Sequence, residues 1–181
     1  MVKGPPRWTF ALRGSRLRVS AGLVAWLVLA VVTLVLGTGR MPFAETPAML
    51  VGCLVVSMLV HEGAHAAAAH RLGYRVEWVV LGGLGGLTAY FGRDDKPLDR
   101  AAVAMAGPAA SAAVALVLAV LRAPLAPDSE ILGLVDLAIF VNALGVIANL
   151  VPVGDSDGAM VLRGLRQHQS DRKRSDVSTR S

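Results

Sequence analysis

Two histidines and a glutamate stand at metal-ligand spacing in HEGAH, residues 61–65. In a helix, His61 and His65 lie one turn apart on the same face, so both can bind one Zn²⁺. Glu62 between them can serve as a general base for a water molecule at that metal. The surrounding residues 55–69 are otherwise apolar or small, and ionisable groups at membrane depth are costly enough to indicate a function. The spacing therefore predicts a zinc site with a base beside it.

A catalytic zinc takes three protein ligands and keeps a fourth position open, so the histidines need a partner. At 1.5 Å per residue, His61 lies about 21 Å into a bilayer core of about 30 Å. Asp136 would differ from it in depth by about 13 Å. Asp155 and Asp157 follow the last apolar segment at a matching depth, after NLVPVG, a stretch rich in helix breakers. Broken backbone at such depth is typical of a buried, wet cavity, and Asp157 is the predicted third ligand.

The elements that must hold these residues are membrane helices. Of the 181 residues, 54% are hydrophobic and only 17% are charged, against about 25% charged in soluble domains. Four apolar windows are long enough to cross a bilayer, at about 20 residues each: 19–36, 47–70, 101–121 and 131–151. The first is interpreted as a retained helix rather than a cleaved signal peptide. Asp136 and Asn142, in the last window, are expected to form interhelical hydrogen bonds.

Charge placement sets the topology. Of the 18 Lys and Arg residues, all but Arg40 and Arg122 fall in three segments, 1–18, 71–100 and the part after residue 151. The positive-inside rule then puts both termini and the 71–100 connection in the cytoplasm. The net charge of +5 comes without an aromatic-interleaved basic patch, so no nucleic-acid partner is predicted. The single cysteine, Cys53, leaves no internal disulfide and no thiolate metal cluster.

Two motifs together resemble the site-2 protease family of intramembrane zinc metalloproteases: HEGAH at 61–65 and NLVPVGDSDG at 149–158. Two weaker elements are also similar to that family, the A-G-P at 106–108 and the glycine-rich segment 80–91. The chain departs from the family pattern in having Gly154 for a second proline. It departs again at Ser111, where Asn is frequent, and at Ser156, where a larger apolar residue is frequent.

The resemblance implies that His61, His65 and Asp157 bind zinc and that Glu62 is the general base. It implies single-pass membrane substrates such as anti-sigma factors, and a minimal form without a PDZ or nucleotide-sensing domain. From the residues alone, Asn149 either holds or polarises a substrate carbonyl or caps the broken helix. The segment 80–91 either offers a strand edge to an unwound substrate or forms a plain turn.

The expected fold is an all-α polytopic membrane protein with about four transmembrane helices, the fourth broken, and a short glycine-rich membrane hairpin. Residues 1–18 form a basic cytoplasmic arm, 19–166 the transmembrane metalloprotease domain, and 167–181 a disordered cytoplasmic tail. The expected location is the cell membrane, in contact with the lipid bilayer. Two alternatives differ in function: another kind of zinc membrane peptidase, and a non-enzymatic metal-binding membrane protein. Glu62 argues against the last, because structural zinc needs no general base.

Overall fold

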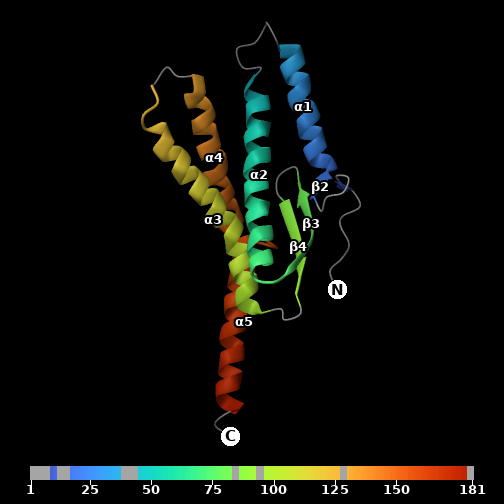
Figure 1. Ribbon diagram of the computed structural model, residues 1–181, viewed down its shortest axis with the longest axis vertical. Coiled ribbons are helices and arrows are strands. Elements are labelled where there is room, and N and C mark those ends of the chain that lie inside the picture. The colour runs from blue at the N-terminus through green and yellow to red at the C-terminus, as the bar shows by residue number, and fades with distance from the viewer. Residues whose placement is uncertain are drawn as a thin grey trace.

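The protein is mostly helical, with one small sheet. The computed structural model describes residues 9–11, 17–37, 45–82, 86–92, 96–126 and 130–178. In chain order the elements are β1 (Thr9–Ala11), β2 (Leu17–Ser20), α1 (Ala21–Gly37), α2 (Glu45–Arg71), β3 (Arg75–Leu81), β4 (Gly86–Phe91), α3 (Pro97–Arg122), α4 (Glu130–Leu150) and α5 (Asp157–Ser178). The molecule is elongated, and α5 extends below the other elements (Figure 1).

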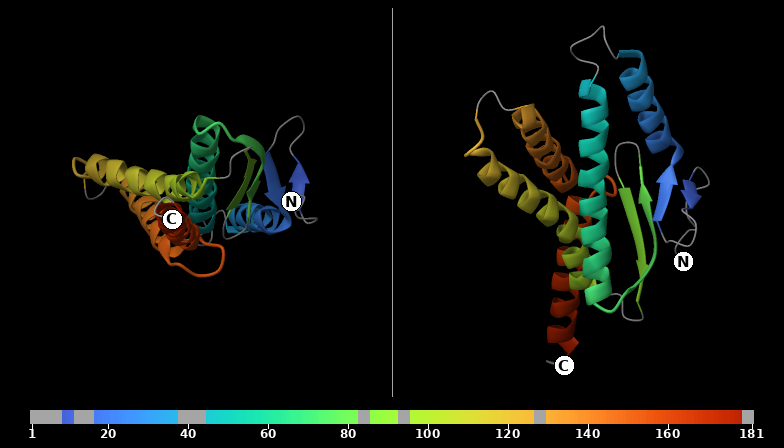
Figure 2. Two further views of the ribbon diagram at one scale, coloured as in Figure 1. Left: turned by 90° about the horizontal axis from the view of Figure 1, so that it is seen from below. Right: turned by 45° about the horizontal axis from the view of Figure 1, so that its top comes forward.

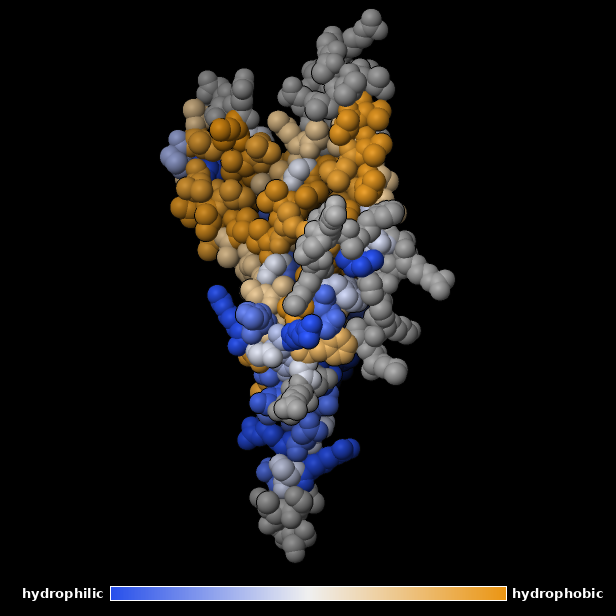
Figure 3. Space-filling model, turned by 45° about the vertical axis from the view of Figure 1, so that its right-hand side comes forward, coloured by the Kyte–Doolittle hydropathy of each residue, from blue (hydrophilic) through white to orange (hydrophobic). Residues whose placement is uncertain are grey.

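Three of the helices, α2, α3 and α4, are long and apolar enough to cross a membrane. The 17-residue α1 is also apolar but shorter, so the first predicted span, residues 19–36, stays a prediction. Large apolar side chains remain exposed on these helices, for example Leu116, Phe140 and Ile147, each at least 60% exposed. They gather over one half of the molecule, while the half that ends in α5 is hydrophilic (Figure 3). Such a broad apolar surface is expected of a membrane-embedded protein.

Helix α2, which carries HEGAH, lies between α3 and the sheet (Figure 1, Figure 2). Helix α3 packs against α2, α4 and α5, so it joins the two parts of the chain that carry the predicted ligands. Its first turn begins at Pro97, whose fixed φ suits the first helical position. Where α3 crosses α2, Gly107 lies against the side chains of His61 and His65 and leaves no room for a side chain of its own.

The prediction of an all-α fold was incomplete, because the described residues include a four-stranded sheet in the order β1-β2-β3-β4. The predicted basic arm supplies β1 and part of β2, and β2 pairs in parallel with β3. Strand β3 contains Trp78, Val79 and Val80. Aromatic and β-branched residues favour strands because they pack well against residues of the neighbouring strands. β3 and β4 pair antiparallel, with Leu81 opposite Gly86; residues 83–85 of the predicted hairpin lie outside the described part of the chain.

The expected break after the fourth span is present. Helix α4 ends at Leu150, Gly154 adopts a left-handed φ of 60°, and α5 starts at Asp157. Ser156 caps α5, since its hydroxyl accepts a hydrogen bond from the Ala159 amide at 3.2 Å. The sequence motif thus turns the chain and restarts a helix with Asp157 at its first position.

Residues 167–178, predicted to be disordered, continue α5 as a helix. Arg, Lys and Gln in this stretch have good helix propensity, and a helix already anchored at Asp157 can extend without a new nucleation step. The side chains of the stretch are mostly exposed. This part of the tail has polar composition, as expected, but regular backbone.

Candidate metal and catalytic centre

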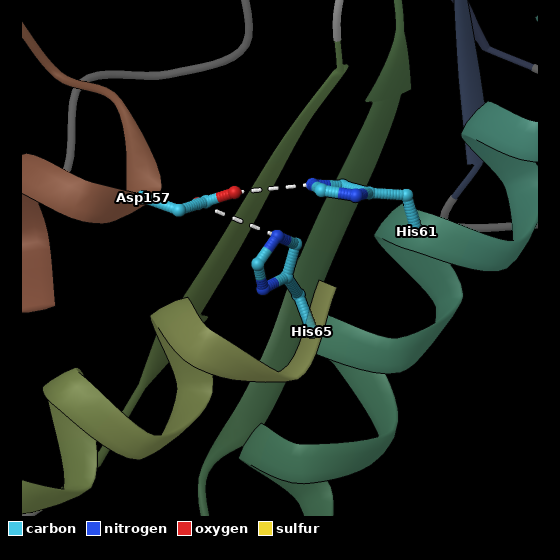
Figure 4. A group of neighbouring side chains, drawn as sticks. All are labelled: His61, His65 and Asp157. Carbon is cyan, nitrogen blue, oxygen red and sulfur yellow. Dashed lines mark hydrogen bonds and ion pairs between the residues drawn. The ribbon is translucent and has the colours of Figure 1, made fainter. Parts of the chain in front are cut away.

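The structure brings His61, His65 and Asp157 together, although the aspartate is almost a hundred residues further along the chain. One ligand atom from each lies within 4.8 Å of the others, and all three residues are buried. Asp157 Oδ2 is 3.1 Å from His61 Nε2, and Asp157 Oδ1 is 3.4 Å from His65 Nε2. The histidines come from α2 and the aspartate from the start of α5 (Figure 4). Two imidazoles and one carboxylate match the donor set of a catalytic zinc site.

The other ring nitrogens of both histidines have partners on α3. His65 Nδ1 donates to the Val103 carbonyl at 2.7 Å, which leaves Nε2, the nitrogen that faces Asp157, available as a metal ligand. His61 Nδ1 is 3.1 Å from Ser111 Oγ, and Ser111 is buried. Metal-binding histidines are typically oriented in this way by a carbonyl or hydroxyl group behind the ring.

Gly107 on α3 lies directly opposite Nε2 of His61 and of His65. A Cβ built on this glycine would collide with Nε2 of both His61 and His65. The missing side chain therefore leaves the space in which an ion between the two rings would be held. The donor set and this space both fit zinc.

Asp157 sits at the first turn of α5, where the helix dipole favours a negative charge. Burial by itself raises the pKa of the Asp157 carboxyl, but hydrogen bonds with His61 and His65 outweigh it and bring this pKa below its ordinary value. The group is therefore a carboxylate at neutral pH, which is the form that binds metal. Gly158, next to it, packs against the Leu150 carbonyl with no room for a side chain, so α5 starts close to the end of α4.

The other acidic candidates lie apart from this cluster. Asp155 contributes to the rim of the cavity, but its carboxylate is almost fully exposed and pairs with Arg163 at 3.2 Å. Asp136 pairs with Arg122, between α4 and α3. Asn142, predicted to bond between helices, donates to Ser57 of α2 at 2.9 Å. The interhelical roles expected for Asp136 and Asn142 are thus present.

The predicted base and the predicted substrate-binding residue line one cavity with the three ligands. The cavity has a volume of about 80 Å³, which suffices for several water molecules but not for a helix. Glu62 lines it, 4% exposed, and Thr88 of β4 donates to Glu62 Oε2 at 2.6 Å. Asn149 also lines it, with its amide donating to the Gly145 carbonyl at 2.8 Å. That bond goes to a carbonyl inside α4 and not to the open carbonyls of its last turn, so it does not cap the broken helix. The position of Asn149 on the cavity is compatible with substrate binding.

Several residues of the centre were missed from the sequence: Thr88, Val103, Gly107 as a space-maker, and Ser111. In the sequence, Gly107 stands out only within the A-G-P motif and Ser111 only as a departure from the family pattern. The A-G-P motif was a usable signal, because a glycine before a helix-interior proline marks a close approach. Nothing local to Thr88 or Val103 distinguishes them from other strand and helix residues.

The fold and the centre define a membrane-embedded protein with a metal site of zinc-peptidase type, and comparisons with known proteins agree. The structure is similar to that of the site-2 protease from Methanocaldococcus jannaschii, with a TM-score of 0.64 over 88% of this chain and 70% of that chain. The two are 20% identical, so this likeness shows the fold.

The sequence comparisons point to the same family of proteins. The model of peptidase family M50 matches residues 49–126, which include HEGAH. The chain is 35% identical to "Putative zinc metalloprotease Rip3" of Mycobacterium tuberculosis over 120 residues, 64% of this chain and 30% of that protein. It is 31% identical to "Putative zinc metalloprotease sll0528" of Synechocystis over 151 residues, 77% of this chain and 39% of that protein. Residues 49–126 thus match peptidase family M50, and the predicted resemblance to the site-2 protease family is confirmed.

The chain spans less than two-fifths of the length of these curated relatives. The family match ends at residue 126, before Asn149 and Asp157. The assignment of Asp157 therefore depends on its place in the structure, beside the two histidines.

Proposed function

We propose that this protein is an intramembrane zinc metalloendopeptidase that cuts transmembrane segments of membrane-anchored substrates. The observation that carries the proposal is the convergence of His61 and His65 from α2 with Asp157 from α5, at a cavity that Glu62 also lines. A metal site without chemistry has no use for a buried glutamate beside it. This favours an enzyme over a non-enzymatic metal-binding protein.

In the proposed reaction, His61, His65 and Asp157 would hold a zinc ion, which would supply Lewis-acid activation of water and of the scissile carbonyl. Glu62 accepts the proton of the attacking water and delivers it to the leaving amine. Val103 and Ser111 keep the imidazole rings oriented, at 2.7 Å and 3.1 Å from their Nδ1 atoms. The peptide bond gains one water molecule and separates into a carboxylate and an amine.

The substrate is proposed to enter as an unwound segment. An intact helix bonds its own carbonyls, and the cavity of about 80 Å³ is too small for one. Among the described strands, β4 lies at the edge of the sheet, and Gly86, Leu87, Thr88 and Tyr90 line the cavity. An extended substrate can add to such an edge by main-chain hydrogen bonds. Asn149, which also lines the cavity, is proposed to contact the substrate backbone.

Single-pass membrane proteins are the proposed substrates, with anti-sigma factors as the leading class by family resemblance. The proposed location is the cell membrane with both termini in the cytoplasm. The exposed apolar surfaces of α2, α3 and α4 support contact with the bilayer. The scissile bond would then lie in the cytoplasmic half of the membrane, where HEGAH is predicted to be.

The test uses purified protein in detergent micelles and a set of single-pass test substrates whose apolar helices carry central Gly and Ser residues, which unwind locally. Cleavage is expected within the apolar segment, to stop when a chelator removes the metal, and to return with Zn²⁺. The flanking peptide without its apolar segment serves as the control and should stay intact. Cleavage that persists in the metal-free protein, or no cleavage across the substrate set, would contradict the proposal.

A further inference from the structure

Strand β4 lies against the carboxylate of Glu62. The Thr88 hydroxyl donates to Glu62 Oε2 at 2.6 Å and lies 3.4 Å from the Glu62 backbone carbonyl oxygen. A length of 2.6 Å is typical of a hydroxyl bonded to a carboxylate, which is among the stronger hydrogen bonds. No other side chain among the described residues donates a hydrogen bond to this carboxylate. Glu62 is 4% exposed, so this bond also satisfies a buried polar group.

The second oxygen of the same carboxylate is placed by the same strand. Gly86 and Thr88 are two residues apart, so they share one face of β4. A Cβ built on Gly86 would collide with Glu62 Oε1. One face of β4 thus contacts both oxygens of Glu62. Thr88 donates a hydrogen bond to Oε2, and the missing side chain of Gly86 leaves room for Oε1.

We propose that Thr88 is a positioning residue for the general base. The inference rests on the proposed function, in which Glu62 must stay within hydrogen-bond reach of the water that attacks the substrate. A glutamate has three rotatable side-chain bonds, and holding one oxygen removes most of that freedom. Thr88 is suited to this because it is β-branched and therefore stiff at χ1, and because β4 is held in register by its pairing with β3.

Two substitutions at Thr88 separate this role from a role in the strand. Thr88→Val keeps the shape, removes the hydroxyl and suits a strand well, whereas Thr88→Ser keeps the hydroxyl and suits a strand less well. Positioning of Glu62 predicts that Val is the damaging change. A role in strand stability alone predicts that Ser is the more damaging of the two.

The experiment measures kcat, KM and zinc content of the wild type, Thr88→Val, Thr88→Ser and Glu62→Gln with the transmembrane test substrates. For Thr88→Val, kcat is expected to fall roughly tenfold or more, the effect of losing a hydrogen bond to a charged group. KM and zinc content should stay near the wild-type values. Thr88→Ser should recover kcat to within a few-fold. If Thr88→Val does not fold, Thr88→Ala replaces it, since that variant also lacks the hydroxyl and adds no atom.

Gly86→Ala is a second probe, since its added methyl would collide with Oε1, Cδ and Cγ of Glu62 while the Thr88 hydroxyl is kept. Its kcat should also fall while zinc is retained. Equal kcat in Thr88→Val and the wild type, or an equal loss in Thr88→Ser and Thr88→Val, would overturn the inference while Glu62→Gln remains inactive. Full activity of Glu62→Gln would instead overturn the proposed function itself.

Discussion

At the scale of single residues, the centre depends on one carboxylate carried by a short turn. Asp157 lies 3.1 Å and 3.4 Å from the two histidine nitrogens, while Asp155, two residues before it, points outward to Arg163. The two aspartates have the same chemistry and nearly the same place in the sequence. They are therefore a matched pair for testing which of them binds zinc.

Asp157→Asn is expected to lose most bound zinc, because the neutral amide is a poor ligand and a two-histidine site is an incomplete cage. The loss of affinity should exceed the roughly 10- to 100-fold that is typical of outer-shell changes. Asp155→Asn is the control and should keep zinc near one per chain, as measured by metal analysis of purified protein. Loss of zinc in the Asp155 variant alone would show that the ligand was assigned two residues too far along the chain.

The residues that lie together in the centre could be singled out from the sequence. The residues that surround and orient them could not. HEGAH places its histidines by helix geometry alone, and a depth argument was enough to favour Asp157 over Asp136. Thr88, Val103 and Ser111 could not be found in this way, because each reaches the centre from an element distant in sequence. Their contacts depend on how α3 and β4 pack on α2, which no local pattern encodes.

At the scale of elements, the crossing of α2 and α3 decides whether the histidines can hold an ion. Gly107 faces Nε2 of both rings, and Pro108 after it is fully buried. Helix propensity alone would favour alanine at residue 107. The glycine is therefore explained by the space it leaves, not by the helix it belongs to.

Gly107→Ala is expected to lower zinc content severalfold or more while the protein stays folded, since the added methyl occupies the place between the rings. Gly63→Ala is the matched control: it lies on the same stretch as the histidines, and a Cβ there meets nothing within 4 Å. Zinc content and circular dichroism of both variants provide the measurement. Full zinc content in Gly107→Ala would mean that the ion binds elsewhere.

The helices could be predicted from the sequence, but the short strands could not. The helices matched their apolar windows because a membrane span is set by length and composition, which are local. The strands β1 and β2 have three and four residues, too few for a recognisable alternation. β1 pairs with β2, and β2 joins the rest of the sheet by pairing with the distant β3. Pairing partners far apart in sequence leave no local signal.

At the scale of the whole molecule, the three long apolar helices and the placement of basic residues make a prediction about orientation. Reporter fusions after residues 96 and 175 should both report the cytoplasm, and a fusion near residue 127 should report the outside, because Lys and Arg gather on the cytoplasmic side. Replacing Arg122 with Ala is a useful control that should leave the topology unchanged. A connection between α2 and α3 found outside would place HEGAH in the opposite half of the membrane from the one predicted.

The central claim is that this molecule is a zinc peptidase in which Glu62 does chemistry and does not bind the metal. Glu62 follows His61 by one residue, about 100° around the helix, and it lines the cavity while the histidines face Asp157. Glu62→Gln keeps the volume of the side chain and removes its basic oxygen. It therefore separates metal binding from catalysis within one variant.

The most direct measurement is zinc content and cleavage of a transmembrane substrate by wild type and Glu62→Gln purified in parallel. Zinc should stay near one per chain in both proteins. Cleavage by the variant should fall by at least about 10²-fold, the lower end of general-base contributions. Cleavage at the wild-type rate by zinc-loaded Glu62→Gln would contradict the account.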